Sequence, residues 1–337
     1  MNFLNSLNLK AISSEVYIIL SIMVKNNFFY LLLFVFAFCS CKAKKMVTTN
    51  NNSNMEVFDW QGHRGCRGLL PENTIEAFLK ALSFNEIVTL ELDLSVSKDN
   101  QLVVSHEPWM SDEICSHPDG SPVYLPDNFV NYIAIHKLNY DEIKKFDCGS
   151  RGHPRFPNQV AMKTYKPTLN EVIQVVKKYC TTNKRKFPKF NIEIKTKPEW
   201  DSLFTPPVND FVDLTIATIK KEFPENYSEI FTIQSFDIRA LEAIWEKDNS
   251  IPIAYLIEND NDFQANMSVL SFIPKIYSPK YDLVNKSLIE QCKAMNMKVI
   301  PWTVNNVDDI KKLIKLGVDG IITDYPNIIG EAIDGNK

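Results

Sequence analysis

The sequence predicts an α/β protein folded as a (β/α)8 (TIM) barrel, with an inserted segment after the early strands. Short β-branched or apolar runs alternate with longer stretches of helical periodicity from about residue 57 onward, which is typical of a parallel sheet. No Gly-x-Gly-x-x-Gly motif follows the first predicted strand, which disfavours a doubly wound dinucleotide-binding sheet. Polar residues recur at the C-terminal ends of strands along the whole chain, as at the rim of a barrel.

The predicted elements follow one another in a regular order. Strands are expected where apolar residues form short runs or alternate with polar ones, at residues 58–62, 88–95, 102–105, 190–195, 231–234, 253–257, 275–278, 299–303 and 320–323. Helices are expected where apolar residues recur at three- and four-residue spacing, at residues 74–82, 169–179, 211–223, 238–247, 285–295 and 307–316. The segment 108–167 is too long for an ordinary connection, and we interpret it as an inserted lid or subdomain of a barrel spanning residues 57–333.

The composition is that of an ordinary globular protein and excludes several classes. Hydrophobic residues make up 45% of the 337 residues and charged residues 23%, which excludes a disordered or collagen-like chain. The 37 basic and 41 acidic side chains give a net charge of −4. Because nothing in this balance provides a polycationic surface, nucleic acid is not an expected partner.

The N-terminal part has the layout of an export signal. Residues 28–38 form an apolar run of eleven residues, which is shorter than the roughly 20 needed for a spanning helix. Lys25 precedes this run, and Ser40 and Cys41 follow it. The arrangement resembles a bacterial lipoprotein signal, which implies that Cys41 becomes the lipidated first residue of the mature chain. We therefore expect residues 1–41 to direct export and residues 42–56 to tether the protein to a membrane, in the periplasm or at the cell surface.

Alternatives stay open for this segment. Phe38 and Cys39 are unusual before a lipidated cysteine, which leaves cleavage without lipid attachment as one alternative. A weaker apolar stretch at residues 16–24 leaves a second, a single membrane anchor helix interrupted by polar residues. The same stretch leaves the start of translation open between Met1 and Met23.

A histidine motif follows the first predicted strand. This strand runs into His-Arg-Gly at residues 63–65, and a helix is expected soon after. The glycine of this motif and Gly68 allow a tight turn, and Asn73 or Thr74 can cap the helix. On this motif alone, an incidental histidine in a strand-to-helix turn is an equally good interpretation.

Two acidic residues lie on one face of the second predicted strand. Glu91 and Asp93 are two residues apart, and the residues that alternate with them are leucines. Because the interior of a parallel barrel is normally apolar, two inward carboxylates would repel each other unless a cation lies between them. A solvent-exposed polar face is the alternative.

A third carboxylate extends this pattern. Glu193 shares a strand face with Lys195. Three carboxylates suit a hard divalent cation such as Ca²⁺ or Mg²⁺, whereas no Cys-x-x-Cys pair or histidine cluster indicates zinc. Since Arg64 and Lys195 would add positive charge beside this ion, the expected ligand is a phosphate group.

The positions of the remaining histidines and of the cysteines indicate different roles for them. His106 ends the third predicted strand and can face His63 across the rim, which would supply one proton acceptor and one proton donor. The insertion holds three further histidines, which we expect at the surface: His117, His136 and His153. Five cysteines follow the signal, and Cys115 with Cys148 is the preferred disulfide pair.

The ordered motifs resemble the glycerophosphodiester phosphodiesterase family. They read H-R-G, P-E-N-T, E-L-D, H-E, I-E-I-K, Q-S-F, W-T-V-N and D-G-I-I-T-D-Y-P from residue 63 to residue 326. The resemblance implies a metal held by Glu91, Asp93 and Glu193, and His63 and His106 as the acid/base pair. It also implies that Arg64 and Lys195 contact the phosphate and that Gln234, Phe236 and Trp302 line the substrate pocket. The sequence departs from the family at Cys66, which follows H-R-G and is interpreted as a packed turn residue, and in the long insertion.

The expected function is metal-dependent hydrolysis of a glycerophosphodiester to glycerol 3-phosphate and an alcohol such as choline or ethanolamine. His106 is the expected acid for the leaving alkoxide. Whether water or the neighbouring glycerol hydroxyl attacks first is left open, as are the head group, the native ion and the oligomeric state. Two alternatives are a phospholipase-like enzyme that cleaves membrane phospholipid and a non-catalytic surface lipoprotein that binds a sugar phosphate or peptide.

Overall fold

The computed structural model describes residues 58–334. The predicted export segment, the tether, Cys41 and the two alternative starts lie outside these residues. Within residues 58–334, each helix is too short or too polar to cross a bilayer.

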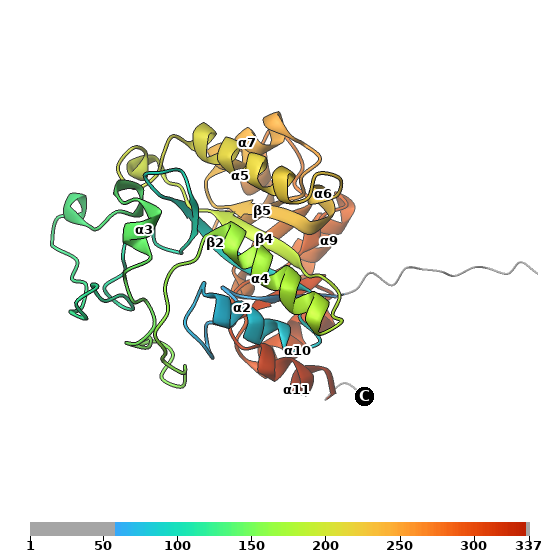
Figure 1. Cartoon of the computed structure of the whole chain (residues 1–337). Helices are drawn as coiled ribbons and strands as arrows, with labels where there is room; N and C mark the ends of the chain where they lie inside the picture. The colour runs from blue at the N-terminus through green and yellow to red at the C-terminus, as the bar shows by residue number, and fades with distance from the viewer. Residues whose placement is uncertain (1–57, 335–337) are drawn as a thin grey trace, which may run out of the picture. The chain divides into compact units, whose positions relative to one another are not determined.

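Parallel strands form a barrel, which confirms the predicted fold class (Figure 1). Its strands are β1 (Asp59–Gly62), β2 (Thr89–Val96), β4 (Lys189–Ile194), β5 (Phe231–Ser235), β6 (Ile253–Ile257), β7 (Ile276–Pro279), β8 (Lys298–Val299) and β9 (Gly320–Thr323). Their hydrogen-bonded order is β8-β7-β6-β5-β4-β2-β1-β9. Backbone hydrogen bonds from Asp319 N to Val299 O (2.9 Å) and from Ile322 N to Pro301 O (3.0 Å) join β9 to the segment around β8, so the ring is nearly closed.

Helices surround this ring, and the longer ones coincide with the predicted periodic segments. They are α2 (Ile75–Leu82), α4 (Leu169–Thr182), α5 (Val208–Glu222), α7 (Ile238–Lys247), α9 (Lys286–Ala294) and α10 (Val307–Leu316). Shorter helices without a clear sequence signal are α3 (Tyr140–Ile143), α6 (Tyr227–Ile230), α8 (Phe263–Ser268) and α11 (Ile329–Asp334). Turns of 3-10 helix lie at Phe129–Asn131, Ile135–Lys137, Pro198–Trp200, Tyr281–Leu283 and Pro326–Ile328.

Two predicted strands differ from the structure. The segment 102–105 forms β3 (Leu102–Val104), which pairs antiparallel with β2 and lies outside the barrel ring. The tight turn before it explains this, because Asn100 adopts a positive φ of 58° and folds the chain back on β2. The predicted strand 299–303 is only Lys298–Val299 long, since Pro301 has no N–H to continue the ladder.

The barrel strands separate an outer core from an interior of mixed polarity. Leu90, Leu92 and Leu94 are fully buried on the outside of β2 in the main hydrophobic core with the helices, as the alternation predicted. The interior between β6 and β9 is apolar and holds Ala254, Ile276, Ile300 and Ile322. The interior beside β1, β2, β4 and β5 is polar instead, and the carboxylates described below lie there.

The insertion between β3 and α4 has a small core of its own. A disulfide joins Cys115 and Cys148, which confirms the predicted pair. Buried side chains beside it include Met110, Val123 and Ile135. Figure 1 shows this segment in green, standing apart from the helices that surround the barrel.

Removing this disulfide should lower stability markedly. The bond closes a loop with a sequence separation of 33 residues, and loops of this length correspond to about 3–4 kcal/mol of restricted unfolded-state entropy. Replacing Cys115 and Cys148 by alanine should therefore lower the free energy of unfolding in urea by about 3 kcal/mol and speed proteolysis within residues 108–167. Equal stability and equal protease resistance in the double variant would contradict this role.

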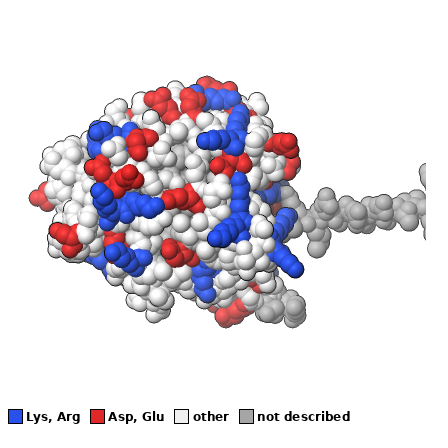
Figure 2. Space-filling model, viewed as in Figure 1, with Lys and Arg blue, Asp and Glu red and all other residues white. Residues whose placement is uncertain are grey.

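The surface charge is mixed on the face that α2 and α4 cover. Figure 2 shows basic and acidic side chains interspersed on this face. The pattern reflects the near balance of 37 basic and 41 acidic residues in the sequence.

Candidate active site

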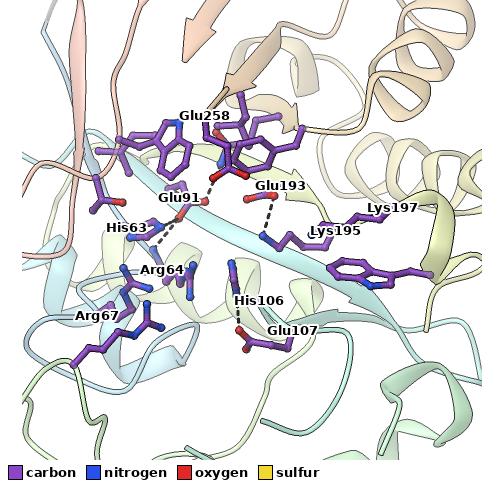
Figure 3. Close-up of a pocket in the computed structure, with 18 of the residues that line it drawn as sticks. His63, Arg64, Arg67, Glu91, His106, Glu107, Glu193, Lys195, Lys197 and Glu258 are labelled. Atoms are coloured by element: carbon purple, nitrogen blue, oxygen red, sulfur yellow. Dashed lines mark hydrogen bonds and ion pairs between the residues drawn. The ribbon is translucent and has the colours of Figure 1, made fainter. Parts of the chain in front are cut away.

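A cavity of about 490 Å³ opens at the C-terminal ends of the barrel strands (Figure 3). The side chains that line it include nine of the ten predicted site residues, namely His63, Arg64, Glu91, His106, Glu193, Lys195, Gln234, Phe236 and Trp302. The tenth, Asp93, lies behind this wall and is 1% exposed. The fold therefore brings together residues that are spread over 240 positions of the sequence.

The three predicted carboxylates converge. Glu91, Asp93 and Glu193 each offer an oxygen, and these oxygens lie within 4.8 Å of one another. The register of the sheet explains this, because β2 and β4 are neighbours in which Asp93 pairs with Glu193. The three side chains are buried, so the cluster could hold a divalent cation.

The electrostatics of the cluster also fit a cation. Burial and the neighbouring Asp93 raise the pKa of Glu91 well above its usual range. Burial likewise raises the pKa of Glu193 to about 7. Although burial opposes charge on Asp93, Arg64 and other cations hold its pKa well below the usual range. Asp93 Oδ1 is buried and has no hydrogen-bond partner, which is what an oxygen that coordinates a metal ion would show in its absence.

Two cations flank the cluster. Arg64 donates its backbone N–H to Glu91 Oε2 (2.9 Å), and its guanidinium contacts Glu72 Oε1 (2.9 Å) and Asp93 Oδ2 (3.2 Å). Lys195 Nζ donates to Glu193 Oε1 (2.9 Å). Arg64 is held in a positive φ of 49°, so its side chain lies beside the carboxylates instead of continuing the line of β1. These cations can meet a phosphate in the cavity.

The turn that carries Arg64 depends on glycine. Gly65 has a φ of +84°, and a Cβ atom there would meet the backbone of Ala77 in α2 at 2.7 Å. The strand and the helix can approach this closely only without a side chain at residue 65. Thr74 caps α2, as one of the two predicted candidates, by accepting from Ala77 N. Asn73 instead donates to Asp93 Oδ2 (2.9 Å).

His63 is oriented by a buried carboxylate. Its Nδ1 lies 2.6 Å from Asp324 Oδ1, which comes from the end of β9. Asp324 also accepts two hydrogen bonds from Arg67 and one from Asn305 Nδ2 (2.7 Å). Burial lowers the pKa of His63 to about 4 although Asp324 opposes this. The ring is therefore neutral at pH 7, with Nδ1–H toward Asp324 and Nε2 available as a proton acceptor.

His106 has the same kind of partner. Its Nδ1 lies 2.6 Å from Glu107 Oε1. Burial and Arg64 lower the pKa of His106. Figure 3 shows His63 and His106 directed into the cavity, with Arg64 between them. Two imidazoles whose free nitrogens face one cavity can accept and donate protons on a molecule bound there.

Comparison with known proteins assigns the chain to a family. Residues 63–328 match the model of the glycerophosphoryl diester phosphodiesterase family. The chain belongs to this family. A glycerophosphodiester phosphodiesterase of Caldanaerobacter subterraneus subsp. tengcongensis is 29% identical over 269 residues, which cover 79% of this chain and 94% of that protein. The predicted enzyme class, a phosphoric diester hydrolase, is confirmed at the level of the family.

Solved structures share the fold. A structure from Silicibacter pomeroyi superposes with a TM-score of 0.72 at 24% identity and covers 84% of this chain and 95% of its own. An Oleispira antarctica phosphodiesterase in complex with the product sn-glycerol-3-phosphate superposes with a TM-score of 0.63 at 23% identity, covering 82% of this chain and 96% of its own.

Several residues of the phosphodiesterase cavity escaped prediction. Asp324 was not among the predicted site residues, and its pairing with His63 joins positions 261 apart. Arg67 and Glu107 line the cavity beside the two histidines. Glu107 follows His106 directly, and this adjacency is the signal that could have indicated it.

One surface prediction was wrong. His153 was expected at the surface of the insertion, but it is 6% exposed. Its Nε2 lies 3.8 Å from Glu72 Oε2 and 3.6 Å from Glu113 Oε2, so the insertion packs a histidine against Glu72, which pairs with Arg64. Trp109 and Arg155 from the same insertion line the cavity. Cys66 is fully buried and donates to Ala77 O, as expected for a packed turn residue.

The Asp324 contact gives a testable prediction for this phosphodiesterase. An asparagine at residue 324 can donate to His63 Nδ1, which moves the ring proton to Nε2 and removes the acceptor. Asp324→Asn should therefore lower kcat about 10²-fold with little change in KM. Steady-state kinetics on glycerophosphocholine measures both, and an unchanged kcat would show that Asp324 does not set the state of His63.

Proposed function

We propose that this protein hydrolyses glycerophosphodiesters to glycerol 3-phosphate and an alcohol. The observation that carries this proposal is the pair of carboxylate-oriented histidines that face one cavity beside a buried carboxylate cluster. The family supports the reaction class, and the product complex of the Oleispira antarctica phosphodiesterase supports the glycerol phosphate part of the substrate.

Glu91, Asp93 and Glu193 would hold one divalent cation. Oxygen ligands of this kind suit Ca²⁺ or Mg²⁺. When bound, the ion would polarise a phosphoryl oxygen and neutralise the charge that develops on it. The raised pKa values of Glu91 and Glu193 support this assignment, because they report buried negative charge that lacks a sufficient counterion.

The phosphate and the protons are handled by the residues around this cluster. Arg64 and Lys195 are placed to bind the non-bridging phosphate oxygens. His63, neutral at pH 7, would accept a proton from the attacking hydroxyl at Nε2. His106 would donate a proton from Nε2 to the leaving alkoxide, and the negative charge of the bound phosphodiester favours its protonated form. Glu107 would hold the His106 ring in place through Nδ1.

An aromatic wall would contact the organic part of the substrate. The rings of Phe236 and Trp302 meet edge to face with centroids 5.4 Å apart. Trp302 Nε1 donates to Ser278 O (2.8 Å), which fixes the indole against the cavity. Gln234 also lines the cavity, but its amide nitrogen is committed to Glu91 Oε1. We therefore assign apolar substrate contacts to the two aromatic residues and a supporting role to Gln234.

The proposed function is tested by release of glycerol 3-phosphate from glycerophosphocholine. We expect release by the purified protein, loss of activity in EDTA, and recovery on addition of Ca²⁺ or Mg²⁺. Transient accumulation of a cyclic glycerol phosphate would identify the glycerol hydroxyl as the first nucleophile, whereas direct attack by water forms no cyclic phosphate. No release from any of several glycerophosphodiesters, or full activity in EDTA, would contradict the proposal.

A second candidate substrate is a membrane phospholipid. Tyr124, Phe129 and Val130 in the insertion are 77%, 48% and 50% exposed, and such side chains can insert into a lipid surface. The insertion also supplies Trp109 and Arg155 to the cavity. Assays of phospholipid vesicles beside soluble glycerophosphodiesters distinguish the two substrates. The third alternative, a surface lipoprotein without activity, is disfavoured because none of the predicted acid, base or metal-binding side chains is missing.

The location of the protein is proposed from its sequence. We infer export with a lipid at Cys41, residues 42–56 as the tether and residues 57–333 as the barrel domain; the family match at residues 63–328 supports the last of these bounds. Incorporation of labelled fatty acid that disappears in Cys41→Ser would support this inference. Labelling that is unchanged in the variant would contradict it.

A further inference from the structure

A chain of hydrogen bonds crosses the polar half of the barrel interior and ends at the cavity. At one end, Asp59 Oδ2 accepts from Gln61 Nε2 (3.0 Å). At the other end, Glu91 Oε1 accepts from Gln234 Nε2 (2.8 Å). Asn191 joins the two halves, because its Nδ2 donates to Gln61 Oε1 and to Gln234 Oε1, each at 2.9 Å. The three amide side chains are 1–2% exposed.

The directions of the three amides are linked along this chain, because each donor must meet an acceptor. With the cation bound, Glu91 is ionised and can only accept hydrogen bonds, so Gln234 turns Nε2 toward it. Gln61 turns Nε2 toward Asp59 in the same way. Both glutamine oxygens therefore face Asn191, which must supply two N–H donors. An amide nitrogen supplies two, and this arrangement leaves Asn191 Oδ1 buried without a hydrogen-bond partner.

An unpaired buried oxygen is unfavourable, and an apolar residue would avoid it. The other half of the barrel interior is filled by apolar side chains such as Ile276, Ile300 and Ile322. The polar chain at Asn191 therefore calls for another explanation. The explanation lies in the orientation of Glu91. Arg64 N donates to its Oε2 and Gln234 Nε2 donates to its Oε1, so both oxygens of this carboxylate are fixed at the cavity (Figure 3).

We propose that Asn191 is a positioning residue for the divalent cation site: by fixing the direction of the Gln234 amide, it holds Glu91 in the orientation that binds the ion. This inference rests on the proposed function, in which Glu91 is a metal ligand. Asn191 acts through Gln234 and contacts neither the ion nor the substrate. Hydrogen-bond partners of metal ligands commonly set ligand orientation in this way.

The substitution Asn191→Asp tests the inference, because it keeps the volume and removes both N–H groups. The Gln234 amide then turns Nε2 toward the new carboxylate and presents Oε1 to Glu91, which loses its donor. We expect Ca²⁺ or Mg²⁺ alone, titrated calorimetrically into EDTA-stripped protein, to bind about 10–100-fold more weakly than to the wild type. The added negative charge by itself would strengthen cation binding, so the sign of the change separates orientation from charge.

Two further variants separate positioning from a general structural role. Gln61→Leu breaks the half of the chain that leads to Asp59 but leaves the Asn191 donor to Gln234, so the ion affinity should stay within about twofold while the protein becomes less stable. Gln234→Met should weaken ion binding, and Asn191→Asp should add no further loss in that background, because both substitutions remove one interaction. Circular dichroism checks that each variant is folded. Asn191→Leu, which is similar in shape and has no donor, replaces Asn191→Asp if the latter does not fold.

The possible outcomes are distinct. Wild-type affinity in the folded Asn191 variant, an equal loss in Gln61→Leu, or additive losses with Gln234→Met would overturn the role of Asn191 and leave the proposed function standing. A wild-type protein that binds neither ion would overturn the proposed function itself.

Discussion

Replacing His63 or His106 by alanine is expected to lower kcat for glycerophosphodiester hydrolysis about 10²–10⁴-fold, because each variant loses one proton transfer. Burial lowers the pKa of His63 to about 4, so the wild-type ring is a neutral acceptor at pH 7. Neither histidine belongs to the main hydrophobic core, so the fold should persist in both variants. His117→Ala, in the insertion and away from the cavity, is the matched control and should retain wild-type activity. Near-wild-type turnover in both active-site variants would refute the acid/base pair.

A change of leaving group separates the two histidines. A glycerophosphodiester of p-nitrophenol releases a stable phenolate that needs little protonation. If His106 is the acid, this substrate should restore most of the activity of His106→Ala and little of that of His63→Ala. Restoration of His63→Ala instead would reverse the assignment.

Replacing Glu91 by glutamine is expected to abolish binding of the divalent ion and to stabilise the metal-free protein. Burial and the neighbouring Asp93 raise the pKa of Glu91, which means that the folded protein disfavours its charge. Glutamine removes this unfavourable charge and loses one of the two hydrogen bonds that Glu91 accepts from Arg64 N and Gln234 Nε2. We expect the charge to be the larger effect, so the melting temperature without metal should rise at pH 8. Activity should fall to background, because only two of the three carboxylate ligands remain to bind the ion.

Thermal unfolding with and without Ca²⁺ measures both effects. An ion present at 100 times its dissociation constant stabilises the wild type by about 2.7 kcal/mol, and Glu91→Gln should show no such shift. Glu258→Gln is the matched control, because this carboxylate also lines the cavity but lies outside the cluster, and its ion-induced shift should equal that of the wild type. A Glu91 variant that keeps the shift, or whose activity is still fully inhibited by a chelator, would count against the ligand set.

Local patterns predicted most of the barrel. Helices such as α7 and α10 match their predicted bounds because the spacing of apolar residues within a helix depends on that helix alone. The segment 102–105 was predicted as a strand, but strand propensity does not reveal that it pairs antiparallel with β2 outside the ring. A positive φ at Asn100 reverses the chain there in a tight turn, in which Asn100 N donates to Ser97 O (3.1 Å).

The site residues that could be predicted lie close to one another in the sequence. The two-residue spacing of Glu91 and Asp93 indicates that they share a strand face, and the same spacing places Glu193 beside Lys195. The partner of His63 could not be predicted in this way, because Asp324 reaches it only through the pairing of β1 with β9. The burial of His153 likewise depends on how the insertion packs against Glu72, for which the sequence provides no local signal.

The central claim is that Glu91, Asp93 and Glu193 together bind one divalent cation at the cavity. Mn²⁺ accepts the same oxygen ligands as Mg²⁺ and scatters X-rays anomalously. A crystal of the full-length protein soaked in Mn²⁺ should show one anomalous peak between these three carboxylates, lost in Glu91→Gln. An absent peak, or a peak bound elsewhere while these carboxylates stay empty, would contradict it.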